Sequence, residues 1–178
     1  MIYDALIILD MQEALINAHP WNEQTVTGNI LKLLNACRSK GIPVIYIRHD
    51  GGKGDELEKG SEGWQVCSRI APAPGETIID KRFNSMFKGT ELDEYLKSIG
   101  ANRLILCGMQ TEYCFDVSCK VAFEHGYRVT VPRGTVTTFD SDFSSAGELT
   151  RYFEERIWNG RYATVKDAAG VLAEILKE

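Results

Sequence analysis

Short apolar runs alternate along the chain with segments in which apolar residues recur every three or four positions. The apolar runs have the length of strands and predict six of them, at 3–9, 44–47, 77–79, 103–107, 127–131 and 162–165. The helical spacing predicts helices within 26–37, 92–99, 114–125, 144–158 and 171–176. Gly41 and Pro43 end the first of these helices, and Gly100 and Gly126 follow two others.

The order of these elements indicates the fold class. Strands that are apolar throughout and separated by helices are typical of a parallel sheet covered on both faces. The pattern therefore predicts an α/β protein, a three-layer α/β/α sandwich with a six-stranded parallel sheet. No repeat, low-complexity tract or linker divides the chain, so residues 1–178 are expected to form a single domain. Residues 49–75 are rich in Gly, Pro and charged residues and are predicted to form a long irregular excursion, a type of loop that often has a function.

Composition and charge limit the kinds of partner that the protein is expected to bind. The 178 residues include 20 Lys and Arg against 25 Asp and Glu, a net charge of −5 without a basic cluster, which disfavours nucleic acid binding. The longest apolar stretch, residues 2–9, is interrupted by Asp4 and is far shorter than the ~20 residues of a membrane helix. No secretory signal is evident, and five cysteines at unrelated spacings do not resemble a disulfide framework. These features predict a cytoplasmic protein with free thiols and no membrane contact.

Three polar residues are expected at one edge of the predicted sheet. In parallel sheets, ligands bind beyond the carboxyl ends of the strands. Asp10 follows the first strand, Lys81 the third, and Cys114 comes soon after the fourth. Separately, Asp10 could cap a turn, Lys81 could be solvated, and Cys114 could be a small buried hydrophobe. Their coincidence at one edge favours a functional interpretation.

The same three residues suit nucleophilic catalysis. A cysteine nucleophile needs a lowered pKa, which a nearby cation and a helix N-terminus supply. Lys81 is expected to provide the cation, and Cys114 opens a predicted helix. The Asp10 carboxylate can accept the thiol proton and later deliver it to a leaving amine.

Three segments resemble the isochorismatase-like cysteine hydrolases, a superfamily that includes nicotinamidases and N-carbamoylsarcosine amidases. The segments are LIILDMQ (6–12), DKRFNSMF (80–87) and CGMQTEYCFD (107–116), and the resemblance covers nearly the whole chain. It implies the Rossmann-like strand order 3-2-1-4-5-6 and a catalytic triad of Asp10, Lys81 and Cys114. It also implies an oxyanion hole made by the main-chain N–H groups of Gln110 and Cys114, in a turn with a cis peptide bond between Met109 and Gln110.

Two departures from the family patterns refine this expectation. Nicotinamidases hold a divalent metal with an Asp-x-His segment and a further His after the second strand, whereas here His49 precedes Asp50 and no second His follows before Lys81. No metal and no cofactor are therefore expected, and His49 is interpreted as a residue that lines or supports the pocket. The isochorismatases proper lack the nucleophilic cysteine, whereas Cys114 is present here.

The expected function is metal-independent hydrolysis of a C–N bond in a small molecule, through a thioester on Cys114. The bond is that of an amide, carbamoyl or cyclic amide group, and water is the second substrate. Two alternatives stay open: a vinyl-ether hydrolase of the isochorismatase type, and a non-catalytic or redox-sensing thiol protein on the same fold. The residues predicted to bind the substrate are Gln12, His49, Phe83, Tyr113 and Phe115.

Self-association is also expected. The resemblance implies a homodimer or a higher homo-oligomer. Trp64, in the long excursion, and Trp158 are interpreted as a source of apolar contact surface.

Overall fold

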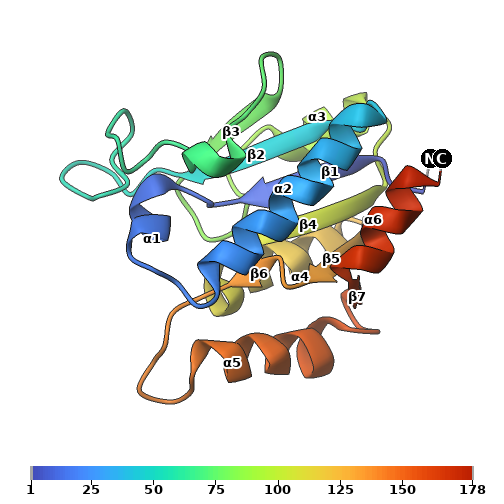
Figure 1. The fold of residues 1–178 in the computed structure, drawn as a ribbon. Helices are drawn as coiled ribbons and strands as arrows, with labels where there is room; N and C mark the ends of the chain where they lie inside the picture. Colours follow the sequence, from blue (N-terminus) through green and yellow to red (C-terminus); the bar gives the residue numbers. More distant parts are fainter. Residues whose placement is uncertain (1, 178) are drawn as a thin grey trace.

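The computed structural model describes residues 2–177 and has an α/β architecture around a parallel sheet (Figure 1). Six strands run in the order β3-β2-β1-β4-β5-β7, and helices flank them, so the expected fold class and strand order are confirmed. The strands are β1 (Ala5–Leu9), β2 (Val44–His49), β3 (Thr77–Lys81), β4 (Arg103–Met109), β5 (Arg128–Arg133), β6 (Val136–Thr137) and β7 (Ala163–Asp167). The helices are α1 (Glu13–Asn17), α2 (Glu23–Ser39), α3 (Leu92–Ser98), α4 (Asp116–Glu124), α5 (Ala146–Tyr152) and α6 (Ala168–Leu176).

An apolar layer covers each face of the sheet, so the central strand β1 is buried on both faces. Ala5, Ile7 and Leu9 of β1 belong to the layer under α3 and α4. Leu6 and Ile8 point to the opposite layer, which α2 and α6 cover (Figure 1). This alternation follows from the period of two along a strand. It explains why β1 reads as an uninterrupted apolar run.

The structure adds one short strand to those expected. β6 pairs with the last two residues of β4, whereas β5 pairs with the first three. The sixth strand expected from the sequence, at 162–165, is therefore β7. A two-residue strand has no periodicity to detect, which is why the sequence pattern missed β6.

Two helices begin or continue differently from the expectation. The helix expected from residue 114 begins earlier, with the wide π-helical turn η2 (Thr111–Phe115), and continues as α4. The long helix expected over 144–158 is α5 followed by a second π-helical turn, η3 (Phe153–Trp158). Both π-helical turns are wider than an α-helical turn, and the sequence pattern of apolar residues does not distinguish the two.

The excursion expected over 49–75 is irregular apart from the short 3₁₀ turn η1 (Ser68–Ile70). Trp64 is only 7% exposed and Trp158 is fully buried, so neither supplies the exposed apolar surface expected of it. Within residues 2–177, no helix combines the length and the apolar character needed to cross a membrane.

Candidate active site

The site lies where the central strands end, at the point where the strand order reverses between β1 and β4. His49 and Lys81 are the last residues of β2 and β3 and are paired in register. Asp10 directly follows β1 and adopts a positive φ of 53°. Cys114 reaches the same edge from η2, after β4. Four segments far apart in the sequence therefore meet at the edge where parallel sheets bind ligands.

A close contact between β1 and β4 requires a glycine beside the site. Gly108 has a φ of 130°, and a Cβ atom there would lie 2.0 Å from the carbonyl oxygen of Leu9. Only a residue without a side chain lets β4 pass the residue before Asp10 so closely. The next peptide bond, between Met109 and Gln110, is cis.

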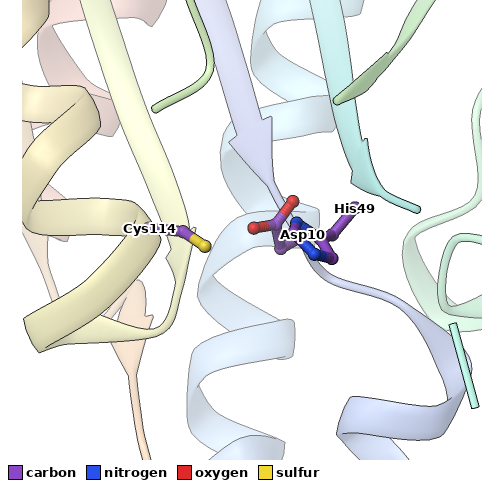
Figure 2. Close-up of side chains that lie close together, drawn as sticks. All are labelled: Asp10, His49 and Cys114. Carbon is purple, nitrogen blue, oxygen red and sulfur yellow. The ribbon is translucent and has the colours of Figure 1, made fainter. Parts of the chain in front are cut away.

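Lys81 lies at the centre of the site with a fully buried side chain. Its Nζ is 2.7 Å from Oδ2 of Asp10, 3.1 Å from Nδ1 of His49 and 3.3 Å from Sγ of Cys114. It also donates to the carbonyl oxygen of Phe83 at 3.1 Å. The structure thus brings together the three residues predicted as a triad and adds His49 to them. Figure 2 shows the Asp10 carboxylate facing the sulfur of Cys114, with His49 beside Asp10.

The surroundings of Cys114 favour the protonated form of its thiol. Burial and the neighbouring Asp10 carboxylate together raise its pKa to about 12, because the opposing effect of Lys81 is smaller. The expectation of a lowered thiol pKa is therefore wrong, because the thiol sits below the surface beside a carboxylate.

Asp10 is placed to accept a proton. Burial raises its pKa above the ordinary value, and the contact with Lys81 opposes this rise. Lys81 occupies Oδ2, while the buried Oδ1 has no hydrogen-bond partner within residues 2–177. An unpartnered buried carboxylate oxygen is costly, and taking up a proton would relieve the cost.

A cleft of about 220 Å³ opens over these groups. It is lined by Asp10, Leu15, His49, Leu57, Asn84, Gln110, Tyr113 and Cys114. Of the residues expected to bind the substrate, His49 and Tyr113 are among them. Asn84, whose Oδ1 is 3.8 Å from Sγ of Cys114, was not singled out although it lies in one of the recognised segments. Leu15 and Leu57 come from α1 and the excursion, and no spacing signal in the sequence points to them.

Three residues expected to bind the substrate do not line the cleft. Gln12 is fully buried, and its amide is used by main-chain groups: it donates to the carbonyls of His49 and Trp64 and accepts from the N–H of His49. The ring of Phe115 is buried against Trp158, 4.9 Å between centroids. Phe83 is about half exposed, and its role at the site is the main-chain carbonyl that Lys81 contacts. Gln12 is thus a positioning residue and Phe115 a core residue.

Asp10, His49 and Cys114 offer three atoms within 4.8 Å of one another that could hold a metal ion. The ammonium of Lys81, however, contacts all three residues, at 2.7 to 3.3 Å. A divalent ion bound by them would be repelled by this charge or would have to displace it. The donor set therefore fits the internal ammonium better than a metal.

Comparisons with known proteins agree with this geometry. The family model of the isochorismatase domain matches residues 4–158. The uncharacterized isochorismatase family protein YddQ of Bacillus subtilis (strain 168) is 30% identical over 176 residues, which cover 94% of this chain and 98% of that protein. An N-carbamoylsarcosine amidase of Arthrobacter sp is 30% identical over 154 residues, 74% of this chain but only 58% of the amidase.

A crystal structure of an isochorismatase-family protein from Chromobacterium violaceum ATCC 12472 superposes on all of this chain and 96% of that one. The TM-score is 0.91 at 28% identity. The match therefore covers the whole sheet and the strand ends that carry the site. The chain belongs to the isochorismatase family of hydrolases.

Proposed function

We propose that the chain is a metal-independent amidohydrolase that cleaves a C–N bond of a small molecule through a thioester on Cys114. The observation that carries the proposal is the buried Asp10 carboxylate. One oxygen is held by Lys81, the other has no hydrogen-bond partner within residues 2–177, and the carboxylate lies within 4.8 Å of the Cys114 sulfur in a small cleft. This is the arrangement that transfer of the thiol proton to a carboxylate requires.

In the first half of the reaction, Asp10 takes the proton of Cys114 as the sulfur attacks the substrate carbonyl carbon. Charge develops on the carbonyl oxygen, and the N–H groups of Gln110 and Cys114 are proposed to stabilise it. Asp10 then gives its proton to the leaving nitrogen, so that the C–N bond breaks and ammonia or an amine departs. The acyl group remains on the sulfur as a thioester.

In the second half, Asp10 accepts a proton from water as the water oxygen attacks the thioester carbon. The C–S bond breaks, the sulfur recovers the proton from Asp10, and a carboxylic acid is released. Lys81 stays charged throughout and offsets the negative charge that moves between the carboxylate and the sulfur.

Three further considerations support this proposal, and the first two also disfavour the alternatives. A protonated thiol with a raised pKa reacts slowly with oxidants, which disfavours a redox sensor. Cys114 lines the cleft, which disfavours a vinyl-ether hydrolase that needs no nucleophilic cysteine. The amidase among the relatives acts on a C–N bond, as its name states, and its similarity covers 74% of this chain.

The test is a screen of small primary amides, carbamoyl compounds and lactams. Ammonia release reports the first two classes, and mass spectrometry reports ring opening of the lactams. The matched control is Cys114→Ala, which should release nothing. Intact-mass spectrometry of the wild-type protein with a turned-over substrate should show an acyl adduct on Cys114. Hydrolysis by Cys114→Ala at the wild-type rate would refute the proposal.

A further inference from the structure

The ring of His49 is held from two directions at the edge of the cleft. Gln12 fixes its backbone, accepting from the His49 N–H at 2.8 Å and donating to its carbonyl at 2.9 Å. The ring nitrogen Nδ1 lies 3.1 Å from the ammonium of Lys81. This double attachment fixes both the end of β2 and the orientation of the ring.

The contact with Lys81 determines which ring nitrogen carries the hydrogen. An ammonium group donates hydrogen bonds and cannot accept them, so Nδ1 of His49 is the acceptor. A neutral ring that accepts at Nδ1 has its hydrogen on Nε2. Burial, and the positive charge of Lys81, lower the pKa of His49, so the ring is neutral near pH 7.

The Nε2–H group is left for a bound molecule. His49 is half-buried and lines the cleft, and among residues 2–177 its Nε2 has no hydrogen-bond partner. The proposed bond cleavage uses a thiol, a carboxylate and main-chain groups and assigns no step to this donor.

The charges around the cleft favour an uncharged occupant. Among the described residues that line the cleft, Asp10 is the only one with a carboxylate, and Lys81 compensates its charge. The remaining lining side chains carry no positive charge: Leu15, Leu57, Asn84, Gln110 and Tyr113. An anionic substrate would face Asp10 without a free cation to balance it.

We propose that His49 is a specificity-determining residue whose Nε2–H donates a hydrogen bond to an acceptor on an uncharged amide substrate, at an atom other than the reacting carbonyl. The inference rests on the proposed function, because it assumes that the cleft binds an amide. It narrows the substrates to compact neutral amides that carry a second acceptor.

Calorimetric titration of Cys114→Ala tests the inference without turnover. The probes are the 2-, 3- and 4-isomers of pyridinecarboxamide, each compared with benzamide, which lacks the ring nitrogen. At least one isomer should bind about tenfold more tightly than benzamide, as expected for one additional hydrogen bond in a desolvated site. The negatively charged 4-carbamoylbenzoate should bind more weakly than benzamide.

A matched pair of second substitutions separates hydrogen bonding from a structural role. His49→Asn keeps an acceptor near Nδ1 for Lys81 but removes the distal donor, and should abolish the preference for the pyridine isomer. His49→Gln keeps a distal donor and should retain much of the preference. If His49→Asn weakened the binding of benzamide as much as that of the preferred pyridine isomer, His49 would have a merely structural role. That result would overturn the inference.

Other results would overturn the inference as well. These are equal affinities for all isomers and benzamide, tighter binding of 4-carbamoylbenzoate, or no binding of any of these compounds at millimolar concentration. Failure of the proposed function is a separate result, because it would appear as the absence of amide cleavage and of an acyl adduct on Cys114 in the wild-type screen.

Discussion

In the proposed mechanism, three residues at the carboxyl edge of the sheet determine the proton balance of the site. The pKa of the Cys114 thiol is raised, one Asp10 oxygen has no hydrogen-bond partner within residues 2–177, and Lys81 contacts both side chains. In the proposed mechanism, the nucleophile is therefore generated during the reaction by proton transfer and is not stored as a thiolate.

Removal of either reacting group should abolish turnover. We expect Cys114→Ala and Asp10→Asn each to lower kcat/KM by at least about 1,000-fold, and the double variant to be little worse, because residues that act as a unit are not additive. The control is Cys119→Ala, which removes a buried cysteine five residues further along that packs in the core. It should keep its activity and lose stability; a comparable loss of activity would contradict the assignment.

Alkylation kinetics should report the protonated thiol. Because the pKa of Cys114 is raised to about 12, its rate of reaction with iodoacetamide should keep rising from pH 7 to pH 10, about tenfold per pH unit, without a plateau. Lys81→Ala removes the cation that lowers this pKa, so alkylation should be slower at every pH. A plateau below pH 8 in the wild-type protein would show a thiolate at rest.

Activity should not depend on a metal ion. The ammonium of Lys81 already contacts Asp10, His49 and Cys114, the residues that would hold one. Turnover by the protein should survive prolonged dialysis against a chelator. Loss of turnover that returns with added zinc, iron or manganese would refute this prediction.

At the scale of elements, the close approach of β4 to β1 brings Cys114, which follows β4, next to Asp10, which follows β1. Gly108→Ala would place a Cβ 2.0 Å from the Leu9 carbonyl oxygen, and we expect a loss of about 2–4 kcal/mol in the free energy of unfolding together with a loss of activity. Gly100 also has a positive φ but open space around it, so Gly100→Ala should cost only about 1 kcal/mol and leave activity unchanged. Chemical denaturation of both variants compares them; equal losses would mean that strain in φ, and not the close approach, matters at Gly108.

The elements also show how much the sequence could predict. Strand order and the meeting of Asp10, Lys81 and Cys114 follow from apolar runs and their polar ends, because parallel strands all end at one edge. Phe115 was misassigned because consecutive residues of a helical turn point in different directions, so that its neighbour Cys114 faces the cleft while Phe115 faces the core. Leu57 was missed because main-chain hydrogen bonds, such as the one from the Gly51 N–H to the Leu57 carbonyl oxygen, determine the path of the irregular excursion. Such contacts leave no pattern in the side-chain sequence.

On the scale of the whole molecule, self-association stays a prediction, but different aromatic residues would supply the contact surface. Trp64 and Trp158 are buried, but Phe123 on α4 and Tyr152 on α5 are about half exposed. Light scattering at micromolar protein should give a mass of at least twice 19.9 kDa. A monomer mass that persists at ten times this concentration would contradict the prediction.

The central position of β1 has a consequence for how the molecule is made. One neighbour of this strand, β2, comes from residues 44–49, but the other, β4, comes from residues 103–109. During synthesis, one edge of the apolar segment Ala5–Leu9 therefore lacks its partner until more than half of the chain has emerged. Unpaired apolar edges join readily to other chains, so the half-made chain is the form most exposed to aggregation and most in need of a chaperone.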